Sequence, residues 1–267
     1  MTVDVEVTLP GVVTITMNDQ RRYNAVSASM ISALRKAFDD ARLSRECRAI
    51  VVTGAGKGFC AGADLGFEDD PFPDTEGRGQ VGVWLKSQEH LAELIIAVRE
   101  SPKPVVAAIH GAAIGGGLGL ALACDIRIAA QSSKFSARFV RVGLTGCDAG
   151  TSYLLPRIVG AGRAADLMLT GRDFGAEEAE RIGMLSRVVP DGEVVGAALE
   201  VAEVIAGHSE YSAAMTKAGL WANLDAPTFR AAIDYENRVQ VLGLFTDNVQ
   251  EAGKAFVEGI PPTWKPM

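Results

Sequence analysis

Short apolar runs rich in β-branched residues alternate with helical patterns along the first half of this chain. The runs indicate strands, and they cover residues 3–7, 12–17, 50–53, 105–109 and 126–129. Between them, residues 29–41 and 91–98 place apolar side chains at helical spacing. This alternation predicts an α/β core in which helices pack on the faces of a sheet.

The last part of the chain has a helical pattern throughout. Helices are predicted over residues 194–205, 212–221, 227–244 and 247–257, with no further β-rich run. We therefore expect residues 1–200 to form the α/β core and residues 201–267 to form a helical C-terminal region. Residues 66–82 are rich in acidic side chains, glycine and proline, so a mobile loop is predicted there.

Composition excludes several classes of protein. With 267 residues, of which 48% are apolar, the chain can bury a substantial core, which argues against disorder. The longest apolar stretches are too short to cross a bilayer, and the N-terminus lacks the pattern of a secretion signal. A cytoplasmic protein without membrane contact is therefore expected. The net charge of −7 argues against nucleic acid as a partner.

The four cysteines of the chain are widely spaced and form no C-x-x-C pair. They are Cys47, Cys60, Cys124 and Cys147. Neither a disulfide framework nor a metal site is predicted, and the thiols are expected to be buried or to lie in loops.

Four glycines are concentrated in the sequence IGGGLGLALACD, residues 114–125. Glycine inside a helix costs about 1 kcal/mol relative to alanine, so the cluster needs a physical reason. The dinucleotide pattern G-x-G-x-x-G fails from Gly115, because Leu120 stands at its last position. The P-loop pattern and the nucleophile elbow of hydrolases are absent as well.

Two predicted strands each run into a turn of small residues that opens a helix. The turns are GAGKGFCAGADL at residues 54–65 and HGAAIGGGLGLALACD at residues 110–125. Free N–H groups at a helix start attract negative charge, and glycine or alanine lets a ligand reach them. Two such turns facing one point would form an oxyanion hole, in which each donor can contribute about a hundredfold to a thousandfold in rate. The alternative is that the glycines only allow close packing of helix on sheet.

Four segments of the chain resemble motifs of the crotonase superfamily of enoyl-CoA hydratases and isomerases, in the same order and at the same spacing. They are FCAGADL, KPVVAAIHGAAIGGGLGLALACDIRIAA, KFS and GTSYLLPRIVG. The resemblance implies a spiral of ββα units with a C-terminal helical trimerisation region, assembled as a homotrimer or a dimer of trimers. It also implies an acyl-CoA thioester substrate in fatty acid metabolism. Coenzyme A is then part of the substrate, and no cofactor is expected. In the family, two backbone N–H groups hold the thioester oxygen, and they match Ala63 and Gly116.

The chain differs from hydratases of the family at the two positions where those enzymes carry their proton-transferring residues. Hydratases of the family use two glutamates, and the matching positions here are Gly119 and Phe139. The nearest replacement is Asp148, because several relatives carry an aspartate just before a similar G-T-S-Y or A-T-S-Y stretch. In dienoyl-CoA isomerase, 4-chlorobenzoyl-CoA dehalogenase and 1,4-dihydroxy-2-naphthoyl-CoA synthase, that aspartate is a base, a nucleophile and a positioning group, respectively. Asp148 is the candidate catalytic acid/base, and an N-cap for a helix starting near Ala149 is the alternative.

Other acidic residues near these motifs are expected to be capping, structural or solvated: Asp64, Glu68, Asp69, Asp70 and Asp125. His90 lies on a helix that flanks the site in relatives, but its register does not match the functional histidine of the dehalogenases.

For coenzyme A, the resemblance implies backbone contacts near Asn24, Ala25 and Ala61. Basic side chains that could contact the phosphates of coenzyme A are Arg21, Arg22, Lys57 and Lys254. Of these, Lys254 would reach the ligand bound by a neighbouring subunit. Solvated surface charge is the alternative for each of these side chains.

The sequence thus predicts an acyl-CoA-processing enzyme of the hydratase and isomerase type, with a thioester enolate stabilised by backbone N–H groups. The alternative from another class is a catalytically inactive member that only binds acyl-CoA, since both glutamates are replaced. The residues do not determine the acyl chain or the choice among hydration, isomerisation and hydrolysis.

Overall fold

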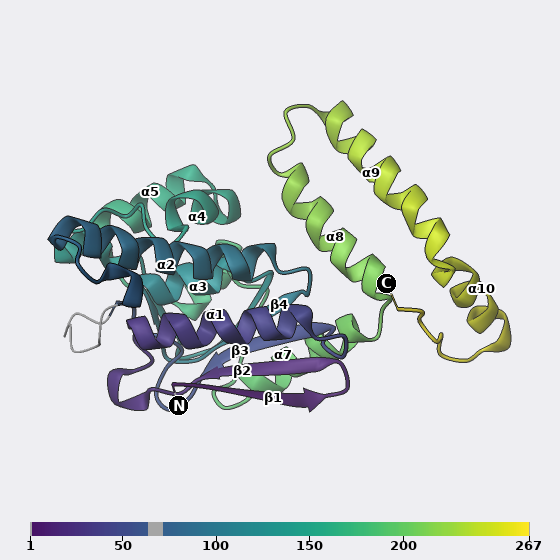
Figure 1. The fold of residues 1–267 in the computed structure, drawn as a ribbon, viewed down its shortest axis with the longest axis horizontal. Helices are drawn as coiled ribbons and strands as arrows, with labels where there is room; N and C mark the ends of the chain where they lie inside the picture. The colour runs from purple at the N-terminus through teal and green to yellow at the C-terminus, as the bar shows by residue number, and fades with distance from the viewer. Residues whose placement is uncertain (1, 64–71, 267) are drawn as a thin grey trace.

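A large, mostly parallel sheet forms the centre of the molecule, in a computed structural model that describes residues 2–63 and 72–266 (Figure 1). Its strand order is β1-β2-β3-β4-β6-β9. Only β1 runs antiparallel to its neighbour, and all five predicted strands lie in this sheet. The strands are β1 (Val3–Leu9), β2 (Val12–Met17), β3 (Ala49–Gly54), β4 (Val105–Ile109), β6 (Ile126–Ala130) and β9 (Arg187–Val189). The predicted α/β class is confirmed.

A second, smaller sheet has the order β5-β7-β8. It contains β5 (Ala112–Ile114), β7 (Lys134–Ser136) and β8 (Phe174–Gly175). Strands β4 and β5, and then β6 and β7, follow one another in the chain but enter different sheets. A bridge between Cys60 and Ala113 attaches the turn after β3 to the second sheet. The chain therefore winds repeatedly between two sheets, as the predicted ββα units require.

Helices cover both faces of the large sheet. Successive side chains of β3 point to opposite faces, and each set packs against a different group of helices. Ile50 and Val52 belong to the core cluster shared with α1 (Ala28–Leu43), α2 (Gln80–Glu100) and α3 (Gly116–Ala123). Val51 belongs to the cluster shared with α7 (Val194–Ala206). A sheet buried on both faces needs apolar residues at every position, which explains the uninterrupted apolar run of this strand.

Three further helices complete the core between β7 and β9. They are α4 (Thr151–Val159), α5 (Ala161–Thr170) and α6 (Ala176–Arg181). Helix α7 runs across residue 200, the expected boundary of the core, and Ala202 is still buried against the sheet.

The loop predicted over residues 66–82 ends earlier than expected, because α2 begins at Gln80, and its mobility stays a prediction. From Phe72 onward the chain forms the short helix η2 (Pro73–Thr75). Phe72 is buried, and its ring stacks on His90 with the ring centroids 3.9 Å apart. Asp64, Glu68, Asp69 and Asp70 lie outside the described residues.

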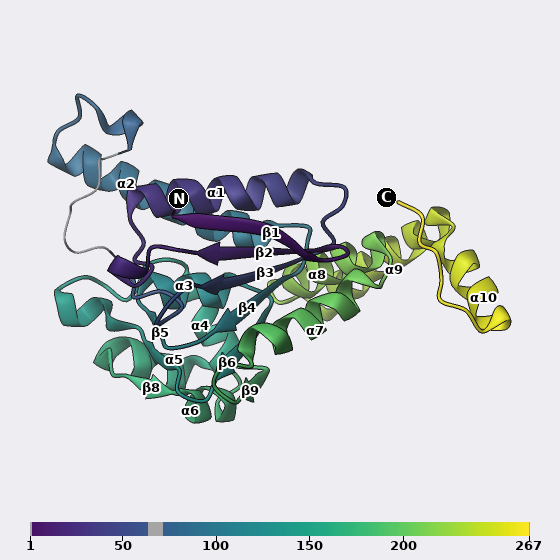
Figure 2. The ribbon, with the colours of Figure 1, turned by 90° about the horizontal axis from the view of Figure 1, so that it is seen from below.

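The C-terminal helices are present as predicted, with ends shifted by a few residues: α8 (Glu210–Asn223), α9 (Phe229–Gly243), η4 (Leu244–Thr246) and α10 (Asn248–Glu258). Figures 1 and 2 show α9 and α10 standing away from the core. Helix α9 buries none of its residues. Along the tail, Phe229, Phe245, Phe256 and Val257 are each more than three-quarters exposed. None of the helices in the described ranges is long and apolar enough to cross a membrane.

Asp125, directly after the end of α3, fixes α8 to the core. Its carboxylate accepts hydrogen bonds from the Val105 N–H (2.7 Å) and the Trp221 Nε1–H (2.8 Å). Lys217 Nζ lies 2.8 Å from the same carboxylate, and burial lowers the pKa of this lysine. The expected structural role of Asp125 is confirmed, and it ties the tail to the end of the glycine-rich helix.

Candidate active site

The turns after β3 and β4 lie against each other. The Phe59 N–H donates to the His110 carbonyl oxygen, and the Cys60 N–H donates to the Ala112 carbonyl oxygen, both at 2.8 Å. The Ile114 N–H donates to the Cys60 carbonyl oxygen at 3.0 Å. The two small-residue turns therefore meet, and the backbone itself holds them together.

The two N–H groups matched by the resemblance come from this junction. Gly116 is the first residue of α3, so its N–H has no acceptor within the helix. Ala63 is exposed and forms a parallel bridge with Val26. A Cβ placed on the preceding residue, Gly62, would lie 3.7 Å from the Gly116 nitrogen. The peptide groups that carry the Ala63 and Gly116 nitrogens are therefore close neighbours.

The glycines of α3 have different physical reasons. Gly115 has a φ of 52° and a ψ of −116°, a backbone conformation that residues other than glycine rarely adopt. A Cβ on Gly117 would lie 2.4 Å from the Cys60 carbonyl oxygen, so this glycine allows close packing. A Cβ on Gly116 would lie 3.4 Å from Val26 Cγ2, which the structure can accommodate. Close packing thus explains the glycine at residue 117, and backbone conformation explains the glycine at residue 115. Neither reason applies to residue 116.

The two positions that the resemblance matches to the hydratase glutamates are closely packed. A Cβ on Gly119 would lie 2.5 Å from both the Cβ and the carbonyl oxygen of Ala149. Phe139 is buried, and its ring lies 3.7 Å from where a Cβ on Gly115 would be. Residue 139 thus contributes an apolar ring, and residue 119 allows a close approach of the backbone at Ala149.

Asp148 belongs to the turn that packs on Gly119. Ala149 and Gly150 both have left-handed backbone conformations, with φ of 45° and 71°. For an alanine this costs about 1–2 kcal/mol, a strain that is typical of turns held by their surroundings. In this strained turn Ala149 packs on Gly119 of α3, and the Asp148 side chain is half-buried.

The N-cap alternative for Asp148 is wrong. Helix α4 begins at Thr151, its N-cap is Gly150, and no side chain caps it. The two left-handed residues separate the Asp148 carboxylate from the first turn of the helix. Asp148 Oδ1 instead accepts hydrogen bonds from the Ala149 N–H (2.6 Å) and from Gln88 Nε2 on α2.

The segment expected to contact coenzyme A lies beside the same turns. Asn24 is fully buried, and its Nδ2 donates to the carbonyl oxygens of Ala55 (3.0 Å) and Gly58 (2.9 Å). Its side-chain amide is thus occupied in fixing the turn, so a contact with coenzyme A would have to come from its backbone. The Ala61 N–H donates to the Tyr23 carbonyl oxygen at 3.0 Å, which draws the two segments together. Ala25, the residue after Asn24, is also buried.

The basic candidates are distributed over two distant regions. Arg22, in the short helix η1 (Gln20–Arg22), lies 4.0 Å from Asp19, and Lys57 is exposed in the turn after β3. Arg21 is exposed beside Arg22. Lys254 is exposed on α10, which Figures 1 and 2 place at the opposite end of the molecule from α3. Lys254 is therefore far from the site of its own chain.

His90 is not directed at Asp148. Its Nε2 makes a hydrogen bond of 2.9 Å with Asp74 Oδ1, and this bond lowers the pKa of Asp74. Together with its stacking on Phe72, the bond attaches the segment before α2 to the helix. His90 is thus an anchor for this segment.

Gln88 is the site residue that the sequence analysis missed. It precedes Leu91 by three positions and Ile95 by seven, and both of these side chains pack on the core. A helical residue at this spacing lies on the same face as the apolar pair. The sequence could have identified Gln88, because it is a polar residue on the helix face that carries the apolar residues of α2.

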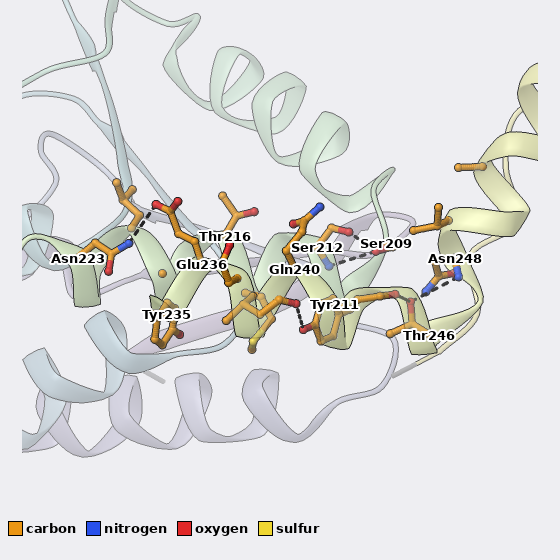
Figure 3. A pocket seen from close by; sticks show the side chains of 18 of the residues that line it. Ser209, Tyr211, Ser212, Thr216, Asn223, Tyr235, Glu236, Gln240, Thr246 and Asn248 are labelled. Carbon is orange, nitrogen blue, oxygen red and sulfur yellow. Dashed lines mark hydrogen bonds between the residues drawn. The ribbon is translucent and has the colours of Figure 1, made fainter. Parts of the chain in front are cut away.

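A hollow separate from the turns after β3 and β4 lies in the tail. It measures about 900 Å³ and is lined by residues of α8, α9, η4 and α10 (Figure 3). Tyr211 is one of its lining residues and donates a hydrogen bond of 2.6 Å to the Val239 carbonyl oxygen. No residue of the turns around Ala63, Gly116 or Asp148 lines this hollow, so it is separate from the candidate active site.

Comparison with known proteins gives consistent matches along the whole chain. Residues 8–266 match the sequence pattern of one family, described as enoyl-CoA hydratase/isomerase. A probable enoyl-CoA hydratase of Mycobacterium leprae is 40% identical over 253 residues, which span 94% of this chain and 86% of that protein. A mevalonyl-coenzyme A hydratase of Beauveria bassiana is 35% identical over 266 residues, which span 98% of this chain and 94% of that protein. The crystal structure of a probable enoyl-CoA hydratase/isomerase from Mycobacterium abscessus has a TM-score of 0.92 at 41% identity, with 99% of each chain covered.

The packing of Ala149 on Gly119 predicts a specific loss of stability. Gly119→Ala should lower the free energy of unfolding by about 1–3 kcal/mol, because the added methyl group overlaps Ala149. Gly196→Ala in α7 is the matched control, since a Cβ there meets open space and should stabilise the helix slightly. Urea unfolding of both variants measures the difference, and equal stabilities would contradict the packing described for Gly119.

Proposed function

We propose that this chain, which belongs to the enoyl-CoA hydratase/isomerase family, holds a thioester oxygen between the N–H groups of Ala63 and Gly116 and moves a proton with Asp148. The substrate is an acyl-CoA, and the backbone near Asn24, Ala25 and Ala61, with Arg22 and Lys57 at the surface, is the proposed contact region for coenzyme A.

The observation that carries the proposal is the contact between Ala149 and Gly119. Gly119 follows Gly116 by three residues, which corresponds to about 4.5 Å along the axis of α3. The side chain of a glutamate at residue 119 would start where Ala149 now lies. Asp148, one residue earlier in that turn, therefore brings a carboxylate from a different segment toward the same part of the site.

The chemistry follows from the charge that develops on the thioester oxygen. Removing a proton next to the thioester carbonyl forms an enolate, and two fixed N–H donors stabilise its negative oxygen. A single carboxylate can take this proton and return it to another carbon, which moves a double bond along the acyl chain. Phe139 stands where a second carboxylate would help to hold a water molecule. The arrangement therefore favours isomerisation of an enoyl-CoA over addition of water.

The tail supports a second proposal, assembly into a homotrimer or a dimer of trimers. Helix α9 buries none of its residues, and Phe256 and Val257 on α10 are almost fully exposed in a single chain. Apolar side chains of this size gain about 1.5–3 kcal/mol each when they are buried. In such an assembly Lys254, near Phe256, would approach the ligand of a neighbouring subunit.

Asp148→Asn tests the proton-transfer role. The amide keeps the oxygen that accepts the two hydrogen bonds but cannot take up a proton, so kcat should fall about a hundredfold or more with little change in melting temperature. Straight-chain 2-enoyl-CoA and 3-enoyl-CoA thioesters, assayed for both double-bond movement and hydration, provide the measurement. Asp40→Asn, on the exposed side of α1, is the control.

Two results would contradict this assignment. Unchanged kcat in Asp148→Asn would remove Asp148 from catalysis. Tight binding of acyl-CoA without turnover of any thioester in the panel would instead support the inactive, acyl-CoA-binding alternative.

Gly116→Pro tests the oxyanion hole, because proline removes one donor at a helix position where it is tolerated. Gly116→Ala keeps the N–H and adds a Cβ that the structure can accommodate. We expect kcat of the proline variant to be about a hundredfold or more below that of the alanine variant. Similar kcat values in two folded variants would show that the Gly116 N–H does not bind the oxygen.

Assembly through the tail is tested by replacing Phe256 and Val257 together with glutamate. Burying these charges would cost more than the lost apolar contacts contribute, so the assembly should dissociate to monomers. Sedimentation equilibrium measures the mass, with Lys36→Glu on the exposed face of α1 as the control. A mass that does not change in the double variant would exclude α10 from the subunit interface.

A further inference from the structure

The Asp148 turn is held from two sides. On one side, Ala149 packs on Gly119 of α3. On the other side, α2 contacts the turn at two points separated by two helical turns. Gln88 donates a hydrogen bond to Asp148, and Ile95 Cγ2 lies 3.3 Å from where a Cβ on Gly150 would be. Helix α2 is therefore aligned along the turn.

The hydrogen bonds distinguish the two oxygens of the Asp148 carboxylate. Oδ1 accepts both the Ala149 N–H and Gln88 Nε2. Within residues 2–63 and 72–266, Oδ2 accepts no hydrogen bond. Two donors on one oxygen restrict rotation of the carboxylate, whereas the Ala149 N–H alone would leave it free to swing about that single bond.

We infer that Gln88 is a positioning residue, which orients the Asp148 carboxylate so that Oδ2 is the atom that takes and returns the proton. The inference rests on the proposed catalytic role of Asp148. A neutral amide suits this task, because it donates a hydrogen bond without exchanging a proton itself. Small errors in the direction of a proton-transferring group are costly to rate, so an orienting donor has a measurable effect on kcat.

The position of Gln88 separates this role from a structural one. Its side chain is exposed, whereas α2 is held to the core by Leu94, Ile95 and Val98. Loss of the Gln88 amide therefore removes little packing. A purely structural role would appear in the melting temperature, and an orienting role would appear in kcat alone.

The experiment uses Gln88→Met, which keeps the length of the side chain and removes the donor. With the best thioester of the 2-enoyl-CoA and 3-enoyl-CoA panel, we expect kcat to fall about tenfold to a hundredfold. KM should stay within about threefold, since the N–H groups that bind the thioester are untouched. Ser87→Ala, which removes a hydroxyl that bonds only to the Val83 carbonyl oxygen of its own helix, should keep full kcat.

A double variant makes the test specific to the Asp148 carboxylate. In the Asp148→Asn background, Gln88→Met should change kcat by less than about twofold, because no proton-transferring carboxylate remains to be oriented. If the two losses multiply instead, Gln88 acts independently of Asp148 and the inference is wrong. A Gln88→Met variant with normal kcat also overturns it.

Failure of this inference can be told apart from failure of the proposed function. If Asp148→Asn loses activity while Gln88→Met does not, Asp148 remains the proton-transfer group and only the role of Gln88 is lost. If Asp148→Asn retains activity, or if no thioester is turned over, both the proposed function and the inference are overturned.

Discussion

The backbone of Cys60 is the point on which the rest of the site depends. Its N–H and its carbonyl oxygen both bond to β5, and Gly117 packs directly against it. Burial raises the pKa of the Cys60 thiol to about 12, so the side chain is a neutral packing group at any physiological pH. Because both neighbouring turns are attached to this one residue, the relative position of the Ala63 and Gly116 N–H groups is set by backbone bonds and does not rely on mobile side chains.

Much of the fold could be predicted from local patterns. The apolar runs at β2 and β4 are long enough to show their periodicity, and the structure starts and ends these strands where the pattern does. Strands β5 and β9 have three residues each, which is too short for periodicity to be visible. Their formation depends on partners that lie far away in sequence, so tertiary context decides them.

The candidate site shows the same division between local and distant information. Each small-residue turn and the structural role of Asp125 could be predicted, because each is recognisable from residue types within one segment. The neighbours of Asp148 were not predictable, since Gln88 is sixty positions away in the chain. The glycine cluster allowed two interpretations, ligand approach and close packing. The structure assigns Gly117 to close packing, whereas ligand approach at Gly116 stays a prediction.

The contact between Gly119 and Ala149 also limits how a chain of this fold can change its chemistry. A carboxylate that starts from α3 and a turn that follows the present course of residues 148–150 compete for the same volume. A glutamate at residue 119 would need the turn to move at the same time, because its Cβ would lie 2.5 Å from Ala149. Residue 119 and the path of the turn would have to be inherited as one unit.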